Sequence, residues 1–428
     1  MSLPRSLSLT QLAVVVVVGA APSCVIATGV IRAYRYAVWA VVGRDLAEGL
    51  ALVLPLVAVV SAVVAATALR PGLLWYAAGL PRSRGHLLGS ALMIAGLSAL
   101  GWLLGSVPLV IWGLRTATYG GPPLTVIVAA GAGVFGISLL AQALTAAFGT
   151  WWAGPGLATL LVAGFYLGRF EDVSFRVPTA PLGFLPYDGV YTTLAGSEAT
   201  PAGLTATRLV GAIVVAAFAS FVLARTAARR TRADRFRAGL LTPATVVVLA
   251  AAAGAGVVRP PVATEVALPV SCVASHGPRV CVFTTHARDL MRIRAMVDRL
   301  LPATGTALLP ARLVSEAVPL GRPDRPDQAR IVVPVDRVTS FDASLASQFG
   351  SQVVLFDRCV DGRASQESAD VSDLIGLWYT WQAGVEPSPA ALTSELRRWA
   401  TEPAVANARF RALAAQIRHC RVRRSELP

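Results

Sequence analysis

The sequence contains no lysine; all 38 of its basic side chains are arginine. This absence excludes two enzyme classes. A P-loop nucleotide site needs a lysine on the β- and γ-phosphates, and a pyridoxal enzyme needs one for its Schiff base. If the protein takes part in an ATP-driven process, we therefore expect another chain to hydrolyse the ATP. We predict no cofactor for this chain.

Charged residues are scarce, at 14% of the chain, whereas hydrophobic residues make up 55%. A soluble domain carries roughly 25% charged residues, so the deficit indicates that much of the surface faces lipid. The charge is also uneven: residues 1–259 hold 18 arginines and 7 acids, and residues 260–428 hold 20 and 17. Nucleic-acid binding would need a basic patch with stacking aromatics on a soluble fold. Membrane topology explains the charge better, and we expect no nucleic-acid partner.

Seven apolar runs are long enough to cross a bilayer, which takes about 17–25 residues. The fourth and fifth runs are separated only by the segment GTWW, so we expect a tight helical pair there. The sequence thus predicts a polytopic α-helical membrane domain over residues 1–258. The predicted spans cover residues 11–30, 49–69, 87–113, 124–148, 151–168, 205–224 and 241–258.

The arginine distribution predicts how these spans are oriented. Cytoplasmic loops collect arginine, and two segments show this bias. Residues 70–86 contain three arginines and no acid, and residues 224–237 contain six arginines and one aspartate. Residues 169–204 carry both signs and are expected outside. With seven spans, a cytoplasmic N-terminus puts both arginine-rich segments in the cytoplasm. The same orientation puts everything after residue 259 outside the plasma membrane.

The first apolar run has a second interpretation as a lipoprotein signal, with a positive start, an apolar core and Cys24. Such a signal prefers leucine, then a small residue, then glycine or alanine before the cysteine. The chain has Ala21, Pro22 and Ser23 there. We favour a membrane span, and both interpretations leave the C-terminal region outside.

The region 259–428 changes character and predicts a small mixed α/β extracytoplasmic domain. Proline-rich residues mark its start. Residues 287–301 have the apolar spacing of an amphipathic helix, and Ser388 followed by Pro389 is a good helix start. The expected strands are residues 279–285, 329–335 and 352–356, and the expected helices are 287–301, 368–384, 388–400 and 403–419.

Four of the five cysteines lie in this region. Outside the membrane, paired cysteines usually form disulfides, and four cysteines allow three pairings. We favour Cys272 with Cys281, which would close a loop containing the turn residues Gly277 and Pro278. The second favoured pair is Cys359 with Cys420, which would tie the last helix to the domain.

A zinc site is the alternative for these cysteines, because three of the four histidines lie in the same region. Zinc sites favour short paired spacings such as C-x₂₋₄-C, which the sequence lacks, so we predict no metal. The histidines concerned are His276, His286 and His419.

Candidate catalytic groups are few, and we predict none. HExxH is absent. His286 and Asp289 could form an acid–base pair. We favour a helix start at these two residues, where the charge of Asp289 complements the helix dipole. Ser138 in GISL could suggest an intramembrane nucleophile, but small residues in spans usually serve helix packing. One aromatic cluster comprises Trp378, Tyr379 and Trp381. It could bind a ligand or face the membrane interface, but packing in a hydrophobic core explains it better.

Residues 11–224 resemble, in layout, the permease subunit of an ABC-2 type transporter. The segment WYAAGLPRSRGH, residues 75–86, lies between the second and third spans, where that family places the cytoplasmic loop that couples to a separate ATPase. Residues 170–196 match the family's wide outer segment. The seventh span and the outer domain are additions to the family's pattern. The resemblance implies these coupling residues: Arg70, Arg82, Arg84 and His86.

The leading hypothesis is a transport subunit that works with a separate ABC ATPase and with a second copy or a related permease. No ionisable residue is expected deep in a span, which argues against a proton- or ion-coupled transporter. It suits export of an amphiphilic substrate such as a lipid, a peptide or an antibiotic-like molecule. One alternative is a non-transporting membrane anchor that presents a disulfide-stapled binding or sensing domain. Another is an envelope enzyme, which would need His286, Asp289 or another outer carboxylate.

Overall fold

The computed structural model divides the chain into two compact units, each with its own core. Unit 1 comprises residues 1–32 and 36–264, and unit 2 comprises residues 33–35 and 265–428. The residues that the structure describes are 8–35, 37–68, 81–117, 121–171, 198–199, 202–226, 264–265, 268–275, 278–304, 312–317, 328–331, 333–334, 340–353, 364–382, 384, 393–418 and 422–427.

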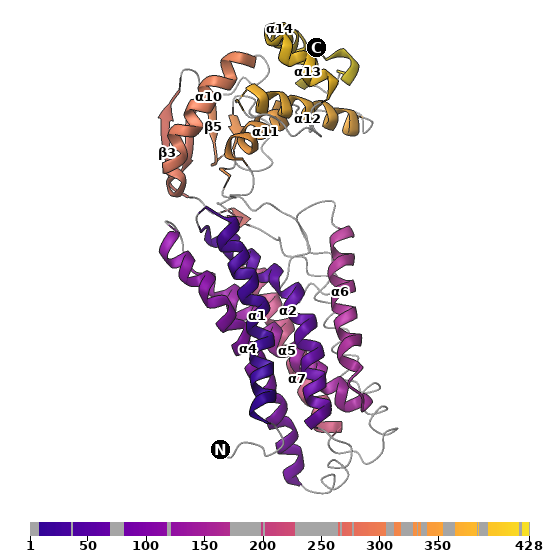
Figure 1. Cartoon of the computed structure of the whole chain (residues 1–428). Coiled ribbons are helices and arrows are strands. Elements are labelled where there is room, and N and C mark those ends of the chain that lie inside the picture. Colours follow the sequence, from indigo (N-terminus) through magenta and orange to yellow (C-terminus); the bar gives the residue numbers. More distant parts are fainter. Residues whose placement is uncertain are drawn as a thin grey trace. The chain divides into compact units, whose positions relative to one another are not determined.

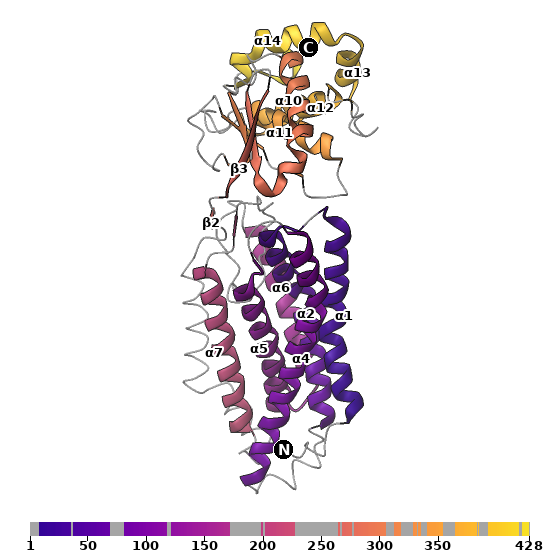
Figure 2. The same ribbon diagram turned by 90° about the vertical axis from the view of Figure 1, so that its left-hand side faces the viewer.

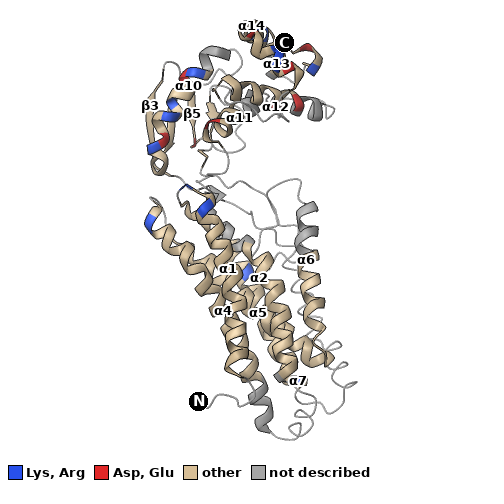
Figure 3. Ribbon diagram, in the orientation of Figure 1, with Lys and Arg blue, Asp and Glu red and all other residues tan. Residues whose placement is uncertain are grey.

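Unit 1 consists mainly of long apolar helices that lie side by side (Figures 1 and 2). Among the residues that the structure describes, five helices are long and apolar enough to cross a membrane. Charged residues are few on the described parts of these helices and frequent in unit 2 (Figure 3). The helices are α1 (Leu9–Ala33), α2 (Trp39–Ala68), α4 (Pro81–Thr116), α5 (Leu124–Phe148), α6 (Ala153–Glu171) and α7 (Ala202–Thr226).

The expected count of seven spans is met only in part. The first four predicted spans and the sixth are found as candidate spans. In α6 the apolar stretch Ala153–Ala163 is shorter than a span, and the predicted span 241–258 lies outside the described residues. Helix α2 begins ten residues before the predicted start of the second span. The predicted loop 70–86 is also too long, because its residues 81–86 already belong to α4.

Helix α5 is the most enclosed of the candidate spans, with more than half of its apolar window buried. It ends at Gly149, whose φ of 67° is left-handed and whose N–H bonds to the Thr145 carbonyl at 2.9 Å. Glycine adopts this conformation without steric cost, so the chain turns at once into α6. The expected tight pair at GTWW is therefore confirmed, and the exposed rings of Trp151 and Trp152 stack 4.2 Å apart at the turn.

Glycines allow α1 and α4 to approach backbone to backbone. A Cβ added at Gly101 would lie 2.3 Å from the Val16 carbonyl oxygen, and one at Gly105 would lie 2.3 Å from the Ala20 carbonyl oxygen. Small residues four apart allow such contacts between membrane helices, where packing rather than the hydrophobic effect drives association. We call this α1–α4 contact the glycine seam.

Unit 2 contains a four-stranded sheet in the order β3-β4-β5-β6. Strands β3 and β4 are antiparallel, and β4, β5 and β6 are parallel. Because β4 and β5 are parallel, the chain must cross over between them, and η1 and α10 lie in that connection. The strands are β3 (Val270–Ala274), β4 (Arg279–Phe283), β5 (Leu313–Ser315) and β6 (Gln328–Arg330), and two further short strands, β1 (Glu198–Ala199) and β2 (Thr264–Glu265), pair with each other.

The helices of unit 2 share one apolar core with the sheet. Trp378, Trp399 and Phe410 lie at its centre with their rings 5.1–6.4 Å apart. Arg35 reaches this unit from the chain just after α1, and its guanidinium lies 4.9 Å from the ring centroid of Phe341. The helices are η1 (Thr284–Asp289), α10 (Leu290–Thr304), α11 (Phe341–Val353), α12 (Ala364–Gln382), α13 (Ser394–Thr401), α14 (Pro403–Arg418) and η3 (Arg424–Glu426).

The mixed α/β architecture agrees with the sequence, but several boundaries differ. The predicted strand 352–356 is wrong at its start, because residues 352 and 353 end α11. The strand expected over 329–335 is only β6. The helix expected from Ser388 is described only from Ser394, where the Thr393 side chain accepts the Leu396 N–H and caps the helix.

Candidate functional sites

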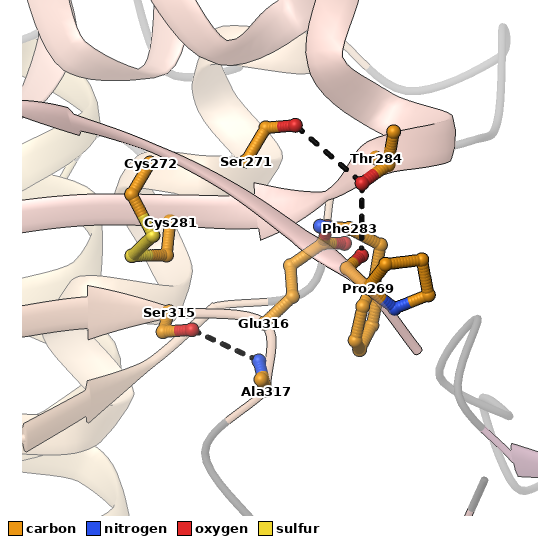
Figure 4. The surroundings of a disulfide bond; sticks show 9 residues. All are labelled: Pro269, Ser271, Cys272, Cys281, Phe283, Thr284, Ser315, Glu316 and Ala317. Atoms are coloured by element: carbon orange, nitrogen blue, oxygen red, sulfur yellow. Dashed lines mark hydrogen bonds between the residues drawn. A yellow bond between two sulfur atoms is a disulfide. The ribbon is translucent and has the colours of Figure 1, made fainter. Parts of the chain in front are cut away.

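The stretch between Cys272 and Cys281 forms a β-hairpin closed by a disulfide, as predicted (Figure 4). The two cysteines face each other across β3 and β4. Backbone hydrogen bonds join Thr284 to Pro269 and Ser275 to Pro278. Since antiparallel ladders alternate, the cysteines fall on a non-hydrogen-bonded pair, where Cβ atoms lie closest. Strand register therefore brings the two sulfurs within bonding distance.

The second predicted disulfide and the zinc alternative are not tested by the structure. Cys359, Cys420, His276 and His419 lie outside the described residues. Within the described ranges, no group of three or more His, Cys, Asp or Glu residues could hold a metal ion. Cys24 lies on α1 as a free, exposed thiol.

A buried histidine–carboxylate pair lies next to this hairpin. His286 Nδ1 is 2.8 Å and 2.9 Å from the two carboxylate oxygens of Glu316, and both side chains are 2% exposed. The same oxygens accept the backbone N–H groups of Phe283 at 2.7 Å and Val333 at 3.0 Å. Because they act as acceptors in these bonds, Nδ1 carries the hydrogen that it shares with them.

Glu316 therefore joins the carboxyl ends of three parallel strands. Phe283 ends β4, Glu316 itself follows β5, and Val333 lies three residues beyond β6. Ligands bind at this edge in many open parallel sheets, but here a carboxylate of the chain occupies it. A histidine oriented by a carboxylate is also the arrangement of many catalytic and metal-binding histidines. Burial of both groups favours a structural role.

The sequence favoured a helix start over a pair of His286 with Asp289, and His286 pairs with a different carboxylate in the structure. Asp289 follows His286 in η1, and its carboxylate lies 3.9 Å from Arg288 Nε. The true partner, Glu316, is 30 residues away. The signal available in the sequence was an acid placed directly after the short apolar stretch ARLVS, residues 311–315.

A second polar cluster lies inside unit 1, where α2, α4 and α5 meet. The hydroxyls of Ser61 and Ser138 are 2.8 Å apart, and Ser98 Oγ lies 3.5 Å from Ser138 Oγ. Gln142 Nε2 donates to the Ala91 carbonyl at 3.2 Å and lies 3.3 Å from Ser138 Oγ. All four polar side chains are at most 2% exposed. We call Ser61, Ser98, Ser138 and Gln142 the polar seam.

The bonding of Ser138 differs from that of most hydroxyls in the described membrane helices. Ser23, Ser106 and Thr145, for example, donate to the carbonyl four residues earlier in their own helix. Ser138 instead bonds across to α2 and α4. The small residues of GISL do contribute to helix packing as expected: a Cβ at Gly136 would lie 3.1 Å from the Ala212 carbonyl oxygen.

The predicted coupling residues lie at the start of α4. Arg82, Arg84 and His86 are within the first turns of this helix, and Arg70 lies outside the described residues. The first turn of α4 contains no acidic residue. Cations near a helix N-terminus are unfavourable, typically by about 0.3–1 kcal/mol each. The wide outer segment 170–196 lies mostly outside the described residues.

Two further expectations can be compared with the structure. Trp378 is fully buried and donates its Nε1–H to Asn407 Oδ1 at 3.0 Å. Trp381 is partly buried against the same core, so core packing explains the tryptophans of the predicted aromatic cluster. Arg208 lies one turn inside the candidate span Thr205–Thr226 and is 2% exposed. The spans are therefore not entirely without a buried charge.

Comparison with known proteins gives no match to a family model, a curated protein or a solved structure. The function of the chain must therefore be inferred from its own geometry.

Proposed function

We propose that the chain is the membrane subunit of an ATP-driven exporter of the ABC-2 type, whose ATPase is a separate chain. The observation that carries the proposal is the continuity of α4. This helix runs for 36 residues from Pro81 to Thr116, roughly 54 Å at 1.5 Å per residue. A bilayer core is about 30 Å thick. One continuous helix thus includes both the arginine pair and a membrane span, with a proline inside it at Pro108.

This continuity suits a coupling element. An ATPase that binds the start of α4 would move the part of the span before Pro108 directly, because the helix is continuous over these residues. The absence of acidic residues from the first turn leaves Arg82 and Arg84 to an acidic surface of the partner. The lack of lysine agrees with the division of labour between two chains.

The two chain segments that together form unit 2 support the proposed topology. Ala33–Arg35 and Glu265–Pro428 belong to one compact unit. Such a unit lies on a single side of a membrane, so the chain crosses an even number of times between residues 35 and 265. Four described candidate spans lie between them, and α6 together with residues 241–258 would add two. An N-terminus in the cytoplasm then places unit 2 outside the plasma membrane, where its disulfide is stable.

The test is purification of the full-length protein in mild detergent from its native host. We expect recovery of an ABC ATPase in stoichiometric amount, lost in the double variant Arg82→Glu, Arg84→Glu. The matched control is Arg409→Glu, Arg411→Glu, which reverses two exposed arginines at the same spacing on α14. Equal recovery from both double variants, or no ATPase after crosslinking in intact cells, would contradict the proposal.

A second function has one observation in its favour. Unit 2 has its own apolar core and a covalently stapled hairpin, as expected of a membrane-anchored domain that binds or senses an extracytoplasmic ligand. Under this alternative, charge reversal at Arg82 and Arg84 leaves function unchanged. The absence of an ATPase from the purified protein would favour it.

A further inference from the structure

Two of the contacts between the described helices of unit 1 differ in their chemistry. The glycine seam between α1 and α4 is so close that a methyl group at Gly101 would overlap a backbone oxygen. The polar seam joins α5 to α2 and α4 through hydroxyl and amide groups that lie within an apolar core shared by the same helices. These two seams respond differently when helices separate.

Opening the glycine seam toward a polar substrate would expose apolar surface at a cost of about 25 cal/mol per Å². It would also lose close packing, which is the main attraction between helices in a membrane. Opening the polar seam would also separate the apolar side chains around it, but its hydroxyl and amide groups can exchange their present partners for a polar group of the substrate. The polar seam therefore offers a polar group hydrogen bonds that the glycine seam lacks.

We propose that unit 1 opens along the polar seam during transport, and that the four side chains of the seam contact the polar group of the substrate. The proposal rests on the proposed function and specifies the substrate class. Hydroxyl and amide groups recognise an uncharged group that both donates and accepts hydrogen bonds, such as the hydroxyl or amide of an amphiphile. The described partners of the seam include no ionisable side chain, so a charged group would be buried there without a counter-ion.

Cysteine reactivity tests whether the seam opens to water. Maleimides react with thiolates, and a thiol buried in apolar surroundings stays protonated and inert. Ser138→Cys and Ser61→Cys are made separately in a Cys24→Ser background of the full-length protein. Native-host cells are treated with N-ethylmaleimide, either energised or depleted of ATP, and peptide mass spectrometry reports modification at each position.

We expect the S138C and S61C thiols to react at least tenfold faster in energised cells. The matched control is Ser106→Cys, because Ser106 is a buried serine of α4 that bonds to its own helix at the Trp102 carbonyl. Its reactivity should stay low in both conditions. If S138C does not yield folded protein, S61C decides the result.

The proposal is overturned if the seam thiols react equally slowly in both conditions, or if the S106C thiol gains the same reactivity. Either result would mean that the polar seam is a structural contact that holds α5 in place. Energy-dependent labelling of the seam without recovery of an ABC ATPase would retain the seam and refute the proposed function. Recovery of the ATPase together with unreactive seam thiols would retain the proposed function and refute opening along the polar seam.

Discussion

Removal of the Glu316 carboxylate should loosen the sheet of unit 2 at the ends of three strands. Glu316→Ala leaves the buried N–H groups of Phe283 and Val333 without an acceptor and removes the partner of His286 Nδ1. An unsatisfied buried donor costs about 1–3 kcal/mol, so the two amides together predict a loss of about 2–6 kcal/mol.

Glu316→Gln should cost less, because the amide keeps one carbonyl oxygen as an acceptor for one of the two backbone N–H groups. Its NH₂ group, however, is itself a donor and would face the other of the two backbone N–H groups. We expect roughly half of the loss caused by alanine. His286→Ala removes a single donor and leaves the carboxylate with both backbone bonds. The expected order of stability is wild type, then His286→Ala and Glu316→Gln, then Glu316→Ala.

Amide hydrogen exchange of the full-length protein in mild detergent measures this loss locally. A loss of 4 kcal/mol corresponds to roughly a thousandfold faster exchange, and it should be seen in peptides covering β4, β5 and β6. Glu395→Ala serves as the control, since it removes a carboxylate that pairs with Arg424 in the first turn of α13, away from the sheet. Exchange within about threefold of wild type for Glu316→Ala, or equal effects of alanine and glutamine, would refute the assigned role of the carboxylate.

Three further predictions concern other contacts. Replacing both Cys272 and Cys281 by serine should destabilise unit 2 by about 2–3 kcal/mol, as expected for a short disulfide loop, and faster proteolysis of the hairpin would show it; unchanged proteolysis would contradict it. Gly101→Val should reduce the yield of monodisperse protein severalfold, because its Cβ would lie 2.3 Å from a carbonyl oxygen of α1, and a normal gel-filtration profile would be evidence against the glycine seam. The hydrogen bond from Arg424 holds the pKa of Glu395 below its ordinary value near 4.5, so the pair stabilises the fold above that pH; the melting temperatures of wild type and Arg424→Ala should therefore converge as the pH falls below about 4.

The membrane helices were the most predictable part of the fold. Hydropathy depends only on local composition, and it found the five candidate spans. The α5–α6 turn was equally local, because GTWW supplies a glycine between two apolar runs. Helix starts were less predictable: α4 begins at Pro81, and proline is favoured at a first helical position, but the low hydropathy of residues 81–86 suggested a loop.

The polar clusters could not be derived in the same way. Ser61 and Ser138 are 77 residues apart, and His286 and Glu316 are 30 apart. Both pairs depend on how helices cross or strands align, which no local pattern encodes. The disulfide was the exception, since a nine-residue separation closed by Gly277 and Pro278 already implies a hairpin. Long-range polar contacts in this chain therefore required tertiary structure.

The segmented make-up of unit 2 has a consequence for the order of events during synthesis. Arg35 leaves the ribosome 306 residues before Phe341, the residue whose ring it contacts. At about 5–20 residues per second, it waits roughly 15–60 s for this partner. During that time the intervening helices of unit 1 are synthesised. Assembly of unit 2 is thus a late step, because its first segment must wait for its last.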